Sequence, residues 1–358
     1  MPLRRASWLR PRLDWIQVEV STHCPAACLY CPHTLYRPVW QHRHMSLDDF
    51  RRLAAAFAKT EMIYLQGWGE PLTHPEFFEM VRLAKAAGCR VGLTTNGMLL
   101  DEEKCLRLVQ EGVDIVAFSL AGVDEENDAI RQGTHFRQVV AAIQTLVRMK
   151  KLLGSARPDV HLAYLMLRSR RQEVEGLPVL LQRLNVKNAV ISTLDFIGDR
   201  VLLAEAILPA TEGAYRDLRS QLEATAEACR RNGSRVDYWL AAPGGHAKDE
   251  PTGMQTSMVD LPFLAFQPQT CTENIHRSAF VSADGAVSPC VYTNVPVTGA
   301  SHIVAGAERP YRRTIFGNIH DAPFEAIWRS KAYSAFRTAH RAGSLPELCL
   351  GCPRARMV

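Results

Sequence analysis

The sequence predicts an α/β fold, a partial (β/α)6 barrel that is open on one side. Short apolar, β-branched segments alternate with longer segments of helical period, as in a parallel sheet with right-handed crossovers. With 358 residues, 47% of them hydrophobic and 22% charged, the chain fits one large domain followed by a smaller one. The six predicted strands are residues 15–20, 62–66, 90–94, 115–119, 160–167 and 189–193.

The helices predicted between these strands begin and end at capping signals. Ser46 is a predicted N-cap with Asp48 and Asp49 in the first turn. Gly88 and Gly112 stand where helix C-caps are expected. The predicted helices are residues 46–59, 75–87, 101–111, 136–150, 170–184 and 211–231.

Polar and glycine residues follow the first four predicted strands. Cys24 follows the first strand, Gly69 and Glu70 follow the second, Asn96 follows the third, and Ser119 ends the fourth. In βα barrels the carboxyl ends of the strands share one rim, where sites are built. We therefore expect these residues to form one site.

The loop after the first strand carries Cys24, Cys28 and Cys31, separated by three and then two residues. Three thiolates leave a metal centre one ligand short of the four that close a structural site. Zinc sites favour paired cysteines separated by a longer loop. Tight cysteine runs are typical of iron–sulfur clusters.

This spacing, with Tyr30 just before the last cysteine, resembles the cluster loop of the radical SAM superfamily. The resemblance implies that the three cysteines bind three irons of a 4Fe–4S cluster, while S-adenosylmethionine (SAM) chelates the fourth. It also implies one-electron cleavage of SAM to methionine and a 5′-deoxyadenosyl radical, which abstracts hydrogen from a substrate C–H bond.

Further segments of residues 14–231 resemble the SAM contacts of this family. Residues 66–71 resemble its Gly-Gly-Glu-Pro motif, with Trp68 where the first glycine would stand. The motif implies contacts with the SAM ammonium group, and the later strand ends imply contacts with the ribose or carboxylate. The implied contact residues are Tyr30, Gly67, Gly69, Glu70, Thr95, Asn96, Ser119 and Arg131.

A second group of cysteines lies in the C-terminal region: Cys271, Cys290, Cys349 and Cys352. A hairpin turn at Gly285 followed by Cys290 resembles the start of a SPASM domain, and the four cysteines resemble its shortened relative, the twitch domain. This implies an auxiliary 4Fe–4S cluster with four protein ligands, which favours electron transfer over substrate binding. A structural zinc site with the same four ligands remains an alternative.

The predicted organisation has four parts: an N-terminal extension of residues 1–13, a radical SAM partial barrel of residues 14–236, a linker or lid of residues 237–265, and an auxiliary cluster domain of residues 266–358. The remaining cysteines, Cys89, Cys105 and Cys229, are predicted to be buried structural thiols.

Four residues in or just after the predicted strands are candidates for a base that deprotonates the substrate. Loss of a proton from a substrate radical would complete its oxidation. The candidates are Glu19 in the first strand, His161 and Tyr164 in the fifth, and Asp195 just after the sixth.

The sequence leaves three kinds of function open. The main expectation is oxidation of a small molecule, such as an alcohol, sugar or aminocyclitol, with the auxiliary cluster accepting an electron. The alternative is a peptide or protein maturase, and only about 14 residues precede the first predicted strand, which weighs against a self-sufficient peptide maturase. The third is a non-catalytic iron–sulfur or zinc protein.

Composition excludes several partners. The formal charge of +5 is too small to indicate nucleic-acid binding. No apolar run approaches the ~18 residues of a membrane span, and the basic N-terminus has no apolar signal region. We expect a cytoplasmic protein with reduced thiols that receives electrons from a flavodoxin or ferredoxin-type donor.

Overall fold

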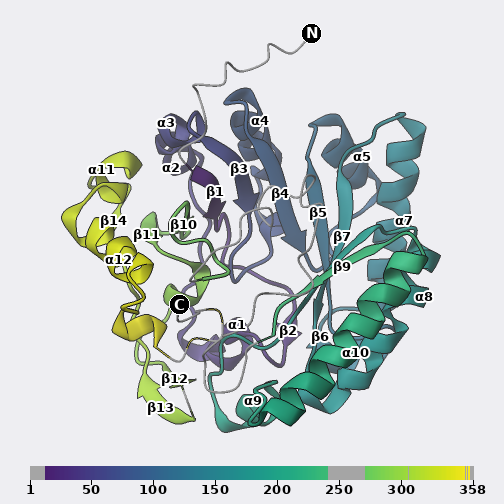
Figure 1. The fold of residues 1–358 in the computed structure, drawn as a ribbon. Coiled ribbons are helices and arrows are strands. Elements are labelled where there is room, and N and C mark those ends of the chain that lie inside the picture. The colour runs from purple at the N-terminus through teal and green to yellow at the C-terminus, as the bar shows by residue number, and fades with distance from the viewer. Residues whose placement is uncertain (1–12, 241–270, 305, 351, 353, 355–358) are drawn as a thin grey trace.

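A ten-stranded sheet in the order β14-β11-β10-β1-β3-β4-β5-β7-β8-β9 forms the centre of the molecule. The computed structural model describes residues 13–240, 271–304, 306–350, 352 and 354 (Figure 1). The sheet does not close on itself, and it confirms the predicted α/β fold with a partial barrel. Nearly all of the predicted extension of residues 1–13 and most of the predicted linker of residues 237–265 lie outside the described residues.

All six predicted strands lie in the parallel part of this sheet, and each begins and ends within two residues of its prediction. They are β1 (Leu13–Val18), β3 (Thr60–Leu65), β4 (Arg90–Thr95), β5 (Ile115–Leu120), β7 (Asp159–Leu165) and β8 (Asn188–Ser192). A further parallel strand that was not predicted, β9 (Arg235–Tyr238), pairs with β8 at one edge. It extends across the predicted domain boundary at residue 236.

The predicted helix caps are present. The Ser46 side chain accepts a hydrogen bond of 3.0 Å from the backbone N–H of Asp49. Gly88 and Gly112 adopt left-handed φ angles of 82° and 69°, which suit a helix C-cap. The helix predicted over residues 46–59 is divided at Leu53 into two shorter ones.

The helices pack around the sheet in the predicted order (Figure 1). The last predicted helix before β8 begins late because residues 168–176 form a 3-10 segment. The helices that connect the parallel strands are α2 (Leu47–Arg52), α3 (Ala54–Phe57), α4 (Phe77–Ala86), α5 (Glu102–Gln110), α7 (Phe136–Leu152), α8 (Leu177–Leu184) and α10 (Glu212–Arg231).

The C-terminal region joins the sheet at its other edge. Strand β10 (Ser278–Val281) pairs parallel with β1, and β11 (Ala286–Ser288) and β14 (Gly317–Asn318) continue the sheet as antiparallel strands. The Asp14 carboxylate lies 2.7 Å from the Arg277 guanidinium and accepts a hydrogen bond of 2.8 Å from Asn274. The two predicted domains therefore share one sheet.

Short elements lie outside the large sheet. Near the carboxyl ends of the parallel strands are β2 (Ala27–Cys28), α1 (Pro32–Leu35), α6 (Asn127–Ile130), β6 (Arg131–Gln132) and α9 (Arg200–Glu205). The C-terminal region adds the hairpin β12 (Ser301–Val304) and β13 (Ala307–Pro310), and the helices α11 (Phe324–Trp328) and α12 (Lys331–Arg341). Figure 1 shows these C-terminal elements, in yellow and light green, on the side of the molecule away from α8 and α10.

The three cysteines outside the two groups are buried, as predicted. Cys89, Cys105 and Cys229 are at most 3% exposed and belong to the main hydrophobic core. Among the described helices, none combines the length and the apolar character that a membrane span requires.

Candidate active site

The three cysteines of the loop after β1 line a cavity of about 220 Å³. Cys28 lies in β2, directly opposite Arg131 in β6, and Cys31 is the N-cap residue of α1. The backbone N–H of Leu29 donates to the Ile130 carbonyl at 3.0 Å. Pairing with β6 therefore holds the loop in place independently of any metal.

The surroundings of these thiols fit an iron–sulfur cluster. Burial raises the pKa of Cys24 to about 12, so this thiol stays protonated at neutral pH unless metal ions replace its proton. The side-chain amide of Asn96 lies 3.7 Å from the Cys24 sulfur and donates to it. Buried thiols that surround one cavity, with an N–H donor directed at a sulfur, are suited to a cluster.

All eight residues predicted to contact SAM line this same cavity: Tyr30, Gly67, Gly69, Glu70, Thr95, Asn96, Ser119 and Arg131. Tyr30 lies between β2 and α1, and Arg131 begins β6. The others stand at or just after the ends of β3, β4 and β5. The sequence expectation of a single rim site agrees with this placement, and each contact with SAM stays a prediction.

Arg131 and Tyr30 contact each other at the wall of the cavity. An Nη1–H group of Arg131 donates to the Tyr30 hydroxyl, and the guanidinium carbon lies 5.8 Å from the ring centre. Arg131 is only 7% exposed, and its Nε has no partner among the described residues. A buried guanidinium with an unused N–H is suited to a carboxylate ligand.

Glu70 joins the loop after β3 to the loop after β4. Its carboxylate accepts hydrogen bonds from the Thr95 hydroxyl at 2.8 Å, the Asn96 backbone N–H at 2.7 Å and the Leu72 backbone N–H at 3.2 Å. Burial raises the pKa of Glu70 to about 7, although these donors oppose the shift. The side chain thus organises two walls of the cavity.

The glycines beside Glu70 are required by close packing. A Cβ atom on Gly69 would lie 2.2 Å from the Ser21 carbonyl oxygen and 2.8 Å from the His23 carbonyl oxygen. A Cβ atom on Gly67 would lie 2.3 Å from the Glu19 side chain. These glycines therefore let the loop lie directly against the segment that leads to Cys24.

Glu19, a predicted candidate base, lies beneath this loop and lines neither of the two cavities described here. Its Oε1 accepts a hydrogen bond of 2.7 Å from the Trp68 backbone N–H, and the side chain is 1% exposed. Burial raises the pKa of Glu19 to about 7. The contacts indicate a carboxyl that supports the loop.

The two other strand candidates are also away from both cavities. His161 is buried near the amino end of β7, and burial lowers its pKa to about 4, with help from nearby arginines. Tyr164 is 1% exposed and packs in the main core. Neither placement supports a role in proton transfer, whereas Asp195 lines both cavities.

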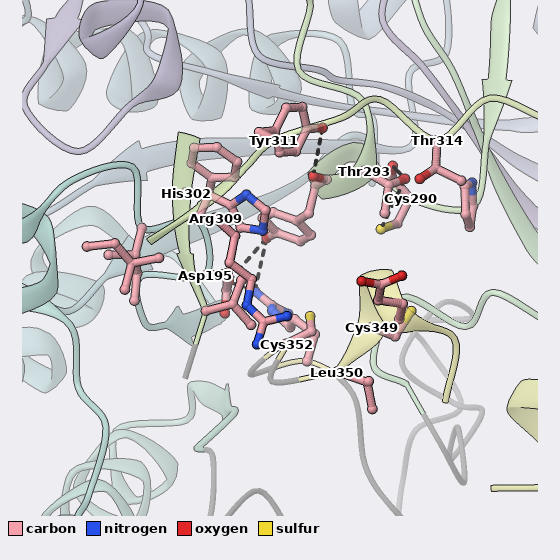
Figure 2. Close-up of a pocket in the computed structure, with 18 of the residues that line it drawn as sticks. Asp195, Cys290, Thr293, His302, Arg309, Tyr311, Thr314, Cys349, Leu350 and Cys352 are labelled. Carbon is pink, nitrogen blue, oxygen red and sulfur yellow. Dashed lines mark hydrogen bonds and ion pairs between the residues drawn. The ribbon is translucent and has the colours of Figure 1, made fainter. Parts of the chain in front are cut away.

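All four cysteines of the second group line a larger cavity of about 690 Å³. Figure 2 shows Cys290, Cys349 and Cys352 on its wall together with Asp195. Burial raises the pKa of Cys349 to about 12, and it also raises the pKa values of Cys271 and Cys290 well above the usual value. These thiols therefore also need metal ions to ionise.

The arrangement of these thiols bears on the zinc alternative. In tetrahedral zinc sites the Zn–S distance of ~2.3 Å brings the sulfurs to within about 4 Å of one another. No three Cys, His, Asp or Glu side chains in the described part of the chain lie close enough to hold a single metal ion. Four cysteines can also ligate a 4Fe–4S cluster completely.

Trp68 joins the two cavities, a role that the sequence did not predict. Its indole N–H donates to the carbonyls of Val291 and Asn294, each at 3.2 Å, and its ring contacts Phe196 and Tyr292 edge-on at 5.9 Å. The only signal in the sequence was its departure from the family motif. The tryptophan thus ties the SAM loop to the segment after Cys290.

Comparison with known proteins agrees with both sites. Residues 18–154 match the model of the radical SAM superfamily, and residues 271–353 match that of an iron–sulfur cluster-binding domain, SPASM. These matches confirm the predicted family and cofactors: a 4Fe–4S cluster and SAM in the first domain, and an auxiliary cluster in the second.

Two curated relatives align over nearly the whole chain. A tungsten-containing aldehyde ferredoxin oxidoreductase cofactor-modifying protein of Pyrococcus furiosus is 25% identical over 334 residues, covering 91% of this chain and 83% of the relative. A PqqA peptide cyclase of Gluconobacter oxydans is 25% identical over 348 residues, covering 94% and 81%.

Solved structures show the same fold at low identity. Streptococcus suis SuiB bound to S-adenosylmethionine has a TM-score of 0.62 at 12% identity, covering 91% of this chain and 68% of SuiB. The protein anSMEcpe with bound AdoMet and Kp18Cys peptide has a TM-score of 0.65 at 17% identity, covering 96% and 88%.

We predict that Glu19→Gln makes the stability of the metal-free protein less dependent on pH. The folded pKa of about 7 exceeds the usual 4.5, so stability from the protonated carboxyl is complete below pH 4.5 and is lost as pH rises through 7. The shift corresponds to about 3 kcal/mol. Urea unfolding at pH 5 and 8 should show the variant gaining relative to wild type at pH 8.

The partly exposed Glu79→Gln serves as the control for this comparison, because it makes the same substitution outside the buried loop. Wild type and both variants contain Glu70, so the effect of its raised pKa on stability cancels when they are compared at one pH. A difference between Glu19→Gln and wild type that is the same at pH 5 and 8 would contradict the prediction.

We predict that Gly69→Ala displaces the SAM loop, because the new Cβ meets backbone oxygens that cannot move aside. The metal-free protein should lose about 1–3 kcal/mol of stability and retain less iron after reconstitution. The control is Gly213→Ala in α10, where the nearest atom to the new Cβ is 3.8 Å away. Equal iron content in the two variants would show that the loop tolerates a side chain.

Proposed function

Because the chain carries a radical SAM domain followed by an iron–sulfur SPASM domain, we propose that this radical SAM enzyme modifies a peptide or protein. The observation that carries the proposal is the similarity to PqqA peptide cyclases through both domains. The similarity to a protein named for modifying the cofactor of another enzyme also supports a maturation function.

Within the first cavity the residues of this chain bind and orient. Cys24, Cys28 and Cys31 would hold the cluster, the free Nε–H of Arg131 would bind the SAM carboxylate, and Glu70 would keep the surrounding loops in register. When bound, the cluster and SAM supply one-electron cleavage of SAM and removal of a hydrogen atom from the substrate. A flavodoxin or ferredoxin-type protein is the proposed electron donor.

Oxidation of a small molecule was the main expectation from the sequence, and the full-length relatives favour the peptide alternative instead. The shared wall of the two cavities also supports an extended substrate. The larger cavity holds the four auxiliary cysteines and meets the SAM cavity at this wall, so a chain lying across it would face both sites.

The test is anaerobic reconstitution followed by dithionite and SAM. We expect 5′-deoxyadenosine without any substrate, and its loss in a variant with Cys24, Cys28 and Cys31 all changed to Ala. Short peptides encoded beside the gene, incubated with the protein, should become two hydrogen atoms lighter by mass spectrometry. No 5′-deoxyadenosine would support the non-catalytic alternative, and an oxidised sugar or alcohol with unchanged peptides would support the small-molecule alternative.

We predict that Cys349→Ala separates the two clusters in function. The variant should still form 5′-deoxyadenosine without substrate, because its SAM cavity is intact, but it should lose the oxidised product if the auxiliary cluster accepts an electron. The buried Cys229→Ala in α10 is the control and should behave as wild type. Product formation by Cys349→Ala at the normal rate would exclude the electron-acceptor role.

A further inference from the structure

The SAM cavity and the auxiliary cavity have three lining residues in common within the described part of the chain: Asp195, Phe196 and Tyr292. Asp195 and Phe196 follow β8, and Tyr292 follows Cys290. A molecule that reaches from one cavity to the other has to pass these three side chains. They form a junction between the two predicted cofactor sites.

At this junction the partners of the Asp195 carboxylate all contact one of its oxygens, Oδ2. Its Oδ2 lies 2.6 Å from Arg354 Nη2 and accepts a hydrogen bond of 3.1 Å from the Tyr292 hydroxyl. Arg354 also lies 3.6 Å from the Glu273 carboxylate. The pairing with Arg354 compensates the charge of a carboxylate whose side chain is only 4% exposed.

The residues around Asp195 occupy equivalent sequence positions relative to the cysteines of the auxiliary domain. Glu273, Tyr292 and Arg354 each stand two residues after a cysteine of the second group: Cys271, Cys290 and Cys352. Two of the four segments that carry these cysteines therefore bind the Asp195 carboxylate directly, and a third is joined to it through Arg354. This fixes the orientation of Asp195 between the two sites.

The other carboxylate oxygen, Oδ1, is buried and has no hydrogen-bond partner among the described residues. A buried carboxylate oxygen without a donor is costly. Asp195 lines both cavities, and Figure 2 shows it in the auxiliary cavity. We propose that Asp195 Oδ1 accepts a hydrogen bond from an N–H group of the substrate and anchors the substrate at the junction.

The surroundings of Asp195 narrow the class of ligand. The Phe196 ring is held edge-on by Trp68 at 5.9 Å and by Tyr311 at 5.5 Å, and it stacks on His302 at 6.1 Å. A fixed aromatic wall thus lies next to the acceptor. An amide N–H beside an apolar or aromatic side chain fits this pair, and a peptide supplies both groups at each of its apolar residues other than proline.

This proposal rests on the proposed function, because it assumes that the N–H donor belongs to a peptide substrate. The role is that of a substrate-binding residue, and it differs from the proton transfer considered for Asp195 from the sequence.

The test uses two probes with the reconstituted holoenzyme and SAM: N-acetyl-phenylalaninamide, and its fully N-methylated analogue, which has no N–H. Binding is measured by saturation-transfer NMR under anaerobic conditions. We expect wild type to bind the amide at least about tenfold more tightly than it binds the N-methylated analogue. We expect the same difference between wild type and Asp195→Asn in binding the amide, since each change removes a hydrogen bond to a charged acceptor.

Asp195→Asn retains one oxygen for Arg354 and Tyr292 and places an NH2 donor where Oδ1 stood. Asp199→Asn is the matched control, because Asp199 lines neither cavity and caps α9 through a bond that Asn also makes. Iron content and cluster absorbance should equal those of wild type in both variants. Equal binding of the two probes, no binding of the amide to wild type, or unchanged binding by Asp195→Asn would each overturn the proposal.

The two proposals fail separately. Amide binding that depends on Asp195, in a protein that modifies no peptide, would reject the peptide function and retain the binding site. Modification of a peptide by Asp195→Asn with an unchanged KM would reject the binding site and retain the function.

Discussion

The parallel pairing of β1 with β10 is the constraint on which the arrangement of both sites depends. The cysteine loop of the SAM site follows β1, while Cys290 follows the strand that pairs with β10. Backbone hydrogen bonds between neighbouring strands fix their separation at about 4.8 Å. The ionic contact of Asp14 with Arg277 supports this pairing at its start. The auxiliary site is thus built onto the barrel sheet.

Close packing of the loop after β3 is the second requirement of the site. Gly69 lies against backbone carbonyls, and two buried carboxyls, Glu19 and Glu70, hold the loop through backbone N–H groups. Burial opposes ionisation of both carboxyls, so this organisation costs stability as pH rises through 7. The result is a preformed cavity, with walls held by buried groups before any cofactor binds.

Contacts across the junction relate the two cavities to function. Trp68 hydrogen-bonds to carbonyls after Cys290, and Asp195 binds Arg354 after Cys352. Movement of the segments after Cys290 and Cys352 would therefore displace side chains in the wall of the SAM cavity. A peptide lying across the junction would meet an acceptor, an aromatic wall and both cofactor sites in succession. His161 and Tyr164 play no part in this arrangement.

The sequence by itself determined the six parallel strands, the two cysteine groups and the eight predicted residues that line one cavity, because strand period, turn glycines and metal-ligand spacing are local properties. The added strand β9, the continuation of the sheet through β10, and the role of Trp68 were decided by tertiary structure. Asp195 shows the reason: its partner Arg354 is 159 residues away in the chain. Such contacts depend on how strands pair and side chains pack, and no local pattern encodes them.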